Sequence, residues 1–149
     1  GRCRCTPRQV HHYLSKLSGP LLDRFDIVVE VPPVEIASLA GGRPGEPSTA
    51  VRARVAEARG RQRERFGPAG PSCNARMGSQ DLDRHASLDP SCRALLVDAC
   101  ERLGLSARAW DRVRRVARTL ADLEGAEAIG PAHVAEAVQY RRALGADGG

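Results

Sequence analysis

An arginine between two aspartates is the first place where this sequence could do chemistry. Residues 21–31 read LLDRFDIVVEV, so Arg24 follows a short turn and precedes an apolar run that resembles a buried strand. A guanidinium held at the end of a sheet can reach a phosphate on another subunit and stabilise the charge that develops on its oxygens. The other interpretation is a local cluster of surface ion pairs among Asp23, Arg24 and Asp26, and the spacing alone favours it.

A second arginine stands in the first turn of an expected helix, SARAWDRVRRVARTLADLEG, residues 106–125. A cation is unfavourable at that end of the helix dipole, so Arg108 does not serve helix stability and we expect it to face an anion. Aspartates 111 and 122 are available as partners one turn away from arginines of this helix. For Arg112, Arg114 and Arg118 the sequence favours a solvated face.

Two cysteines, Cys3 and Cys5, have the Cys-x-Cys spacing that can give two thiolates to one zinc ion. A tetrahedral site needs four ligands, and the nearby His11 and His12 are the only further donors in this region, so free thiols are the simpler interpretation. The chain has five cysteines and no sign of export. An odd number of cysteines in such a chain fits a reducing cytoplasm better than a disulfide framework.

The elements that must position Arg24 lie in residues 1–32. Thr6, Pro7 and Gln9 form a capped helix start, and Gly19 with Pro20 ends that helix. The β-branched run 27–31 then predicts a strand buried on both faces, as in a parallel sheet covered by helices. No comparable strand follows, so we expect the rest of the sheet to lie in sequence upstream.

The remainder is expected to be helical. Residues 33–50 are rich in Gly and Pro and are interpreted as a linker, 51–144 as a bundle of short amphipathic helices, and 145–149 as a tail. An arginine-rich helix over 51–66 carries a thin apolar stripe. Further helices are expected with starts at Ser79, Asp89, Ser106 and Pro131. The predicted fold class is therefore mainly α: a small helical bundle preceded by the last helix and strand of an α/β unit.

The net charge of +5 and the sequence pI of 9.3 are compatible with an acidic partner such as nucleic acid or nucleotide phosphate. Lys16 is the only lysine among 23 basic residues, so much of the arginine could equally cover a solvated surface. Aromatic residues make up only 3%, which leaves little for stacking on bases. No apolar run is long enough to cross a bilayer, so membrane insertion is not expected.

Several segments together resemble a known family. CRCTPRQVHHYLSKLSGPLLDRFDIVVEVP, NARM, LGLSARAWDRVRRVARTLADLEG and IGPAHVAEAVQYR, in this order, are similar to the C-terminal part of the magnesium-chelatase-like AAA+ ATPases of the bacterial ComM/YifB type. The resemblance covers nearly the whole chain. It implies that a P-loop ATPase core lies upstream and that residues 1–32 are its final segment, followed by the helical lid.

The resemblance also implies roles for individual residues. Arg24 matches the arginine finger that enters the nucleotide site of the neighbouring subunit in a hexameric ring, and Asp23 matches the acidic residue beside it. Arg108 matches the sensor-2 arginine, which reaches the γ-phosphate of ATP bound to its own subunit. Cys3 and Cys5 match a Cys-x-Cys that shares a zinc site with upstream cysteines. ATP and Mg²⁺ are the implied cofactors of the intact protein.

The chain departs from the full family pattern in one respect. It has no Gly-x-x-x-x-Gly-Lys-Ser/Thr loop and no apolar strand ending in Asp-Glu, so the segment alone is not expected to hydrolyse ATP or bind it tightly. For the intact protein the resemblance implies a DNA helicase or branch-migration motor in natural transformation and recombination. The alternatives are a magnesium-chelatase-type subunit that remodels a protein partner, and a free-standing basic helical module that binds nucleic acid without ATP.

Overall fold

The structure is a computed structural model that describes residues 4–16, 18, 21, 23–34, 41 and 45–142. Its regular elements in these residues are helices, and the predicted mainly α fold is confirmed. They are α1 (Pro7–Leu14), α4 (Ser48–Phe66), the 3-10 turn η1 (Asn74–Arg76), α5 (Ser79–His85), α6 (Pro90–Leu103), α7 (Ala107–Glu124) and α8 (Pro131–Arg142). No described helix combines the length and the apolarity that a membrane span requires.

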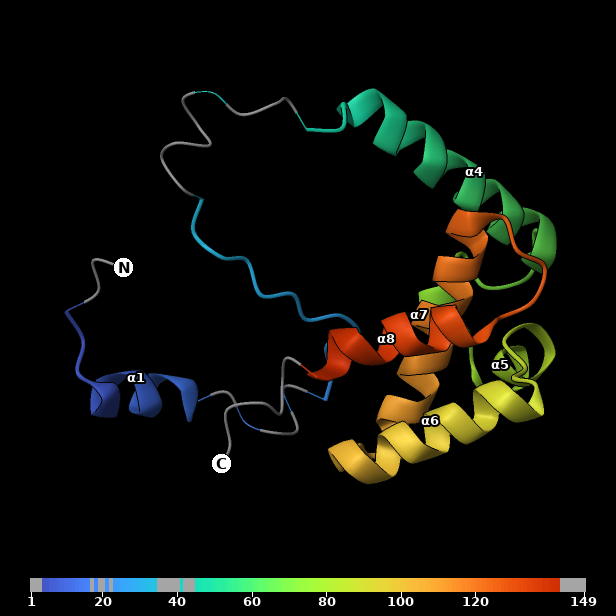
Figure 1. Cartoon of the computed structure of the whole chain (residues 1–149). Helices are drawn as coiled ribbons and strands as arrows, with labels where there is room; N and C mark the ends of the chain where they lie inside the picture. The colour runs from blue at the N-terminus through green and yellow to red at the C-terminus, as the bar shows by residue number, and fades with distance from the viewer. Residues whose placement is uncertain are drawn as a thin grey trace.

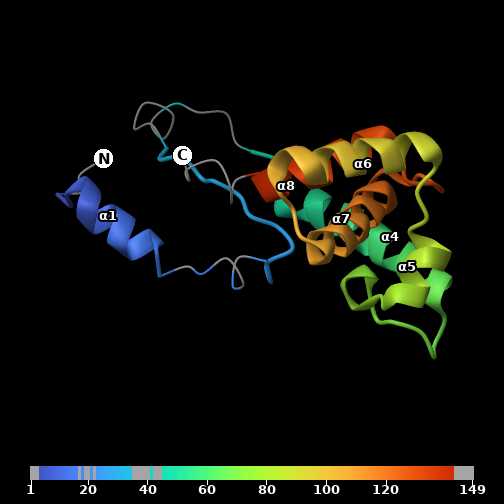
Figure 2. The same cartoon turned by 90° about the horizontal axis from the view of Figure 1, so that it is seen from below.

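Helix α7 is the centre of the bundle. It contacts α8, α4, α5 and η1, while α6 packs against α8. Figure 2 shows α6 and α8 on one side of α7, with α4 and α5 on the other. An element covered on several sides needs an apolar surface that is wider than a single stripe. Small and β-branched residues of α7 provide this surface. The buried ones are Ala109, Val113, Val116, Ala117 and Ala121.

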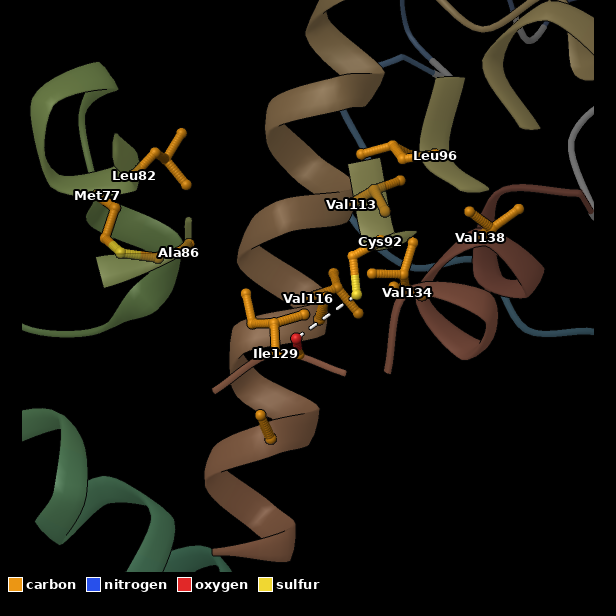
Figure 3. Close-up of a cluster of buried hydrophobic side chains, with 13 residues drawn as sticks. Met77, Leu82, Ala86, Cys92, Leu96, Val113, Val116, Ile129, Val134 and Val138 are labelled. Carbon is orange, nitrogen blue, oxygen red and sulfur yellow. Dashed lines mark hydrogen bonds between the residues drawn. The ribbon is translucent and has the colours of Figure 1, made fainter. Parts of the chain in front are cut away.

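The hydrophobic core extends to both sides of α7 (Figure 3). Met77, Leu82 and Ala86 lie on one side, whereas side chains from α6 and α8 lie on the other, with Val113 and Val116 of α7 between them. The Cys92 thiol is fully buried there and donates to the carbonyl oxygen of Ile129, with 3.5 Å between sulfur and oxygen. The core therefore joins α5 to α8 into one unit through α7.

The ends of the helices follow from local chemistry. Thr6, Asp89 and Ser106 cap α1, α6 and α7 as predicted, each accepting a hydrogen bond from a backbone N–H of the first turn. Ser79 was expected to cap α5, but Gly78 occupies the cap position and Ser79 is the first helical residue. Gly125 ends α7 in the left-handed conformation (φ 82°), where a Cβ would also lie 3.1 Å from Nη2 of Arg61.

The expected strand over residues 27–31 is not formed. The segment is extended, but Ile27, Val29 and Val31 are 50%, 61% and 82% exposed. A strand needs partners for its backbone groups, and the described residues offer one such bond, from the N–H of Val28 to the carbonyl oxygen of Tyr140 (3.1 Å). Residues 7–13 of α1 are likewise exposed, and Figure 1 shows α1 apart from the bundle. Both segments therefore leave apolar side chains uncovered by the described residues.

Helix α4 is longer than expected and is only half covered. It begins at Ser48, inside the region interpreted as a linker, and continues through Gly60 to Phe66. Ala58 is buried and Phe66 packs against the core, but Val51 and Val55, on the same predicted stripe, are 36% and 46% exposed. The apolar stripe is thus used at the C-terminal half of the helix, where α4 contacts α7.

Candidate functional site

Arg24 lies in a turn and its side chain is exposed. Its backbone N–H donates to the carbonyl oxygen of Leu21 over 2.9 Å, which closes the turn. Within the described part of the chain, the Arg24 guanidinium makes no hydrogen bond or ion pair. The turn thus holds the backbone N–H of Arg24, while the guanidinium has no polar partner in the described residues.

The aspartates on either side of Arg24 bind the helical bundle instead. Asp23 accepts from the hydroxyl of Ser106 (2.9 Å) and from the guanidinium of Arg141 (3.1 Å). Asp26 forms an ion pair with Arg112 of α7. The local ion-pair cluster considered from the sequence is therefore wrong for both aspartates, because each is held by an arginine more than 80 residues away in the chain.

Arg108 is exposed in the first turn of α7. The preceding Ser106 has two functions: its Oγ accepts from the N–H of Ala109 (3.3 Å) as the helix cap, and it donates to Asp23. The helix that carries Arg108 is thus hydrogen-bonded at its start to the residue before Arg24. Arg108 itself has no polar partner among the described residues.

Three other arginines of α7 do not lie on the solvated face that the sequence had suggested. Arg112, Arg114 and Arg118 were expected on a solvated face, but their side chains are 20%, 11% and 3% exposed. Arg114 donates to the carbonyl oxygens of Leu82 (2.8 Å) and Ala86 (3.1 Å), which satisfies acceptors at the end of α5. An arginine of an amphipathic helix can lie on a covered face when it finds such acceptors, because its long stem is apolar.

A buried polar centre lies at the other end of α7. The sequence offered Asp122 as a partner for an arginine one turn away, and the pair with Arg118 is present, but the burial of both residues was not expected. The carboxylate of Asp122 is fully buried and accepts from Arg65 of α4 (3.0 Å), from Nδ2 of Asn74 (2.8 Å) and from Arg118 (3.2 Å). Arg118 also donates to the carbonyl oxygens of Ala126 and Glu127 (2.6 and 2.7 Å). The centre ties α4, η1 and the end of α7 together, so its role is structural.

The charge of Asp122 depends on these partners. Burial would raise the pKa of this carboxyl, but the hydrogen bonds from Arg65 and Asn74 and the positive charge of Arg118 outweigh burial, and the pKa lies below its ordinary value of 3.8. Burial lowers the pKa of Arg118, and the nearby carboxylate opposes this effect. A carboxyl with a lowered pKa in the folded state stabilises the fold above its unfolded pKa and loses that contribution as the pH falls.

We therefore expect acid to destabilise the bundle through Asp122. The free energy of unfolding should be level down to about pH 4 and should fall as the pH is lowered further. Urea unfolding followed by circular dichroism across this range measures it. In Asp122→Asn the decline should be smaller, whereas in Asp98→Asn, which changes an exposed carboxylate, it should be unchanged. An equal decline in all three proteins would contradict this assignment.

The predicted zinc ligands do not meet in the described part of the chain. Cys3 lies outside the described residues, and Cys5 is an exposed free thiol. No cluster of three or more His, Cys, Asp or Glu side chains able to hold a metal occurs in the described ranges. His11 and His12 are exposed on α1. A shared zinc site stays a prediction for the intact protein.

Two family descriptions match this chain. Residues 45–141 match the family described as magnesium chelatase, subunit ChlI C-terminal, and residues 1–39 match magnesium chelatase, subunit ChlI. The first match covers α4 to α8 and the second covers the segment with Arg24. The chain belongs to the magnesium chelatase ChlI family.

Within this family, the chain is of the ComM/YifB type. It is 42% identical over 139 residues to the competence protein ComM of Haemophilus influenzae and 43% identical over 140 residues to the uncharacterised protein YifB of Salmonella typhimurium, in each case over 93% of this chain. An uncharacterised protein of Mycobacterium tuberculosis is 39% identical over 142 residues, 94% of this chain. The matched regions are 26%, 27% and 28% of these relatives, so the chain spans about a quarter of their length.

Proposed function

We propose that this magnesium chelatase family chain is the arginine-finger segment and helical lid of a ring-forming AAA+ ATPase. Under this proposal Arg24 completes the nucleotide site of the neighbouring subunit, with Asp23 beside it, and Arg108 contacts the γ-phosphate of ATP in its own subunit. ATP and Mg²⁺ are the cofactors of the intact protein, whose active form is a hexameric ring. The free thiols of the described cysteines are compatible with a protein that acts in the reducing cytoplasm.

The observation that carries the proposal is a contrast among arginines. On α7, Arg112, Arg114, Arg115 and Arg118 are all bonded to carboxylates or carbonyl oxygens, whereas Arg108 is exposed and has no polar partner in the described residues. Arg24 is likewise exposed while both its aspartate neighbours are held. Two guanidinium groups that are exposed and have no polar partner in the described residues are suited to stabilise phosphate charge.

For the intact protein we propose movement on DNA, as a helicase or branch-migration factor in transformation and recombination. The name of one relative, competence protein ComM, and the exposed, arginine-rich start of α4 support this interpretation. The alternative is a magnesium-chelatase-type ATPase that remodels a protein partner, which the family name supports. The two differ in their ligand, and the salt dependence of binding separates them.

The test is DNA binding by the whole protein at increasing salt. A DNA motor should bind duplex or branched DNA with an affinity that falls by orders of magnitude between about 50 and 200 mM salt, because phosphate contacts release counterions. DNA should also increase its ATP hydrolysis. A protein that binds no DNA at low salt, and whose ATPase DNA leaves unchanged, would favour the protein-remodelling alternative.

Arg108→Ala in the whole protein is expected to lower the turnover number for ATP by about 10²-fold or more, because one charge-stabilising donor is lost from the transition state. Arg102→Ala, which removes an exposed arginine on α6 paired only with Asp98, is the matched control and should keep wild-type turnover. Steady-state hydrolysis at saturating ATP measures both. Wild-type turnover in Arg108→Ala would refute the sensor role.

A further inference from the structure

Arg141, near the end of α8, holds the residues on both sides of Arg24. Its Nη2 donates to the carboxylate of Asp23 over 3.1 Å, and its Nη1 donates to the carbonyl oxygen of Phe25. The forked guanidinium thus contacts residues one before and one after Arg24. A lysine could not reproduce this contact, because an ammonium is a point charge without two separate planar donors.

The burial and incomplete hydrogen bonding of Arg141 are not explained by stability alone. Its side chain is 2% exposed, and its Asp23 partner is 29% exposed. Its Nε is the one buried side-chain polar atom of the described residues that lacks a hydrogen-bond partner. Burying a guanidinium is unfavourable before its partners are counted, so an apolar side chain would often stabilise the fold as well. The use of an arginine here calls for a reason beyond packing.

The same carboxylate connects Arg24 to the start of α7. One oxygen of Asp23 accepts from Arg141 and the other accepts from Ser106, the cap of the helix that carries Arg108 in its first turn. Two further contacts run in parallel: the ion pair between Asp26 and Arg112, and the hydrogen bond from the N–H of Val28 to Tyr140. Residues 23–28 are therefore joined to both α7 and α8, and they would move with the bundle.

We propose that Arg141 is a positioning residue for Arg24. Arg141 of α8 and Ser106 at the start of α7 both donate to Asp23, the residue before Arg24, so the direction of the Arg24 side chain depends on where α7 and α8 lie. This inference deepens the proposed function and rests on it. A shift of α7 caused by nucleotide at Arg108 would change the orientation of Arg24, which the same subunit presents to its neighbour. The joint of Asp23, Ser106 and Arg141 would thus connect one subunit's nucleotide site to the next.

The test uses Arg141→Met in the whole protein, since methionine keeps most of the buried aliphatic volume and removes the donors. We expect ATP hydrolysis to fall by about 10²-fold, the scale expected when a catalytic group is misplaced by roughly 1 Å. Arg115→Met is the matched control. It removes another lid arginine, whose side-chain hydrogen bonds in the described residues go to the carbonyl oxygen of Met77 and not to residues 23–28, and turnover should be nearly unchanged.

Mixing separates a finger defect from general damage to the lid. Arg141→Met subunits keep Arg108. In rings mixed with Arg108→Ala subunits, which keep Arg24 and its contacts through Asp23, Ser106 and Arg141, hydrolysis should recover well above that of either variant alone. Recovery supports the proposal. Loss of activity without recovery would overturn it, because the damage would then lie in the subunit's own site or fold. Wild-type activity of Arg141→Met would overturn it as well.

Arg24→Ala measured in parallel separates the failure of this inference from the failure of the proposed function. If Arg24→Ala is inactive and Arg141→Met is active, only the positioning role is lost. If Arg24→Ala is as active as wild type, the finger role fails and the positioning role fails with it. Thermal unfolding of Arg141→Met and Arg115→Met, followed at 222 nm, verifies that both variants are folded at the assay temperature.

Discussion

Replacing Arg24 by alanine in the whole protein is expected to lower ATP hydrolysis by about 10³-fold or more, the range in which an arginine finger contributes to phosphoryl transfer. The reason is that a guanidinium at the γ-phosphate neutralises charge that develops only in the transition state. Steady-state hydrolysis at saturating ATP, with DNA present, measures the loss. Binding of ATP should change far less than turnover, since the subunit's own site is intact.

Two controls make this result specific to Arg24. Arg76→Ala removes another exposed arginine from the helical bundle and should keep wild-type turnover. Arg24→Lys keeps the charge but not the planar fork, and should recover only a small part of the activity. Full activity in Arg24→Ala would return this arginine to an ordinary surface role.

The second large effect is expected on stability. Asp122→Ala should lower the free energy of unfolding of the helical bundle by about 3–5 kcal/mol, because removing one partner leaves buried charges uncompensated. Arg118 would then keep only carbonyl acceptors, and Asn74 would lose its 2.8 Å acceptor. Urea unfolding followed at 222 nm measures the change.

The control for this prediction is an exposed pair of similar chemistry. Asp98 pairs with Arg102 one helical turn away on α6, with side chains 54% and 76% exposed. Asp98→Ala should lower the free energy of unfolding by less than about 1 kcal/mol, as expected when an exposed ion pair is lost. Equal effects of Asp98→Ala and Asp122→Ala would mean that the centre around Asp122 contributes no more than a surface pair.

The features that the sequence predicted correctly, such as the helix starts, depend on residues close together in the chain. Thr6, Asp89 and Ser106 act within three residues of the helix starts that they cap, so their pattern can be recognised without a structure. The strand over 27–31 could not be confirmed in this chain, because a strand is completed by hydrogen bonds from other segments. The apolar run is present, but Ile27 and Val31 remain exposed.

The contacts of the arginines could not be predicted for a different reason. Whether an arginine of α7 is solvated depends on which carbonyl or carboxylate the fold brings to it. Arg112 finds Asp26 86 residues away, and Asn74 finds Asp122 48 residues away. A signal was present for Asp122, since Arg118 stands four residues before it on a helix whose neighbouring positions are apolar. The exposure of Arg108 agrees with the argument from the helix dipole, which needs only the local sequence.

The most direct test of the central claim is a mixture of Arg24→Ala and Arg108→Ala subunits of the whole protein. Each variant alone should be nearly inactive, the first because its neighbours receive no finger and the second because its own site is impaired. In mixed rings an Arg24→Ala subunit beside an Arg108→Ala subunit regains a complete site. With equal amounts and random assembly, about a quarter of the sites, and of the wild-type hydrolysis, should return. If the mixture stays as inactive as its components, the two arginines do not serve different subunits, and the assignment of this chain as finger and lid is contradicted.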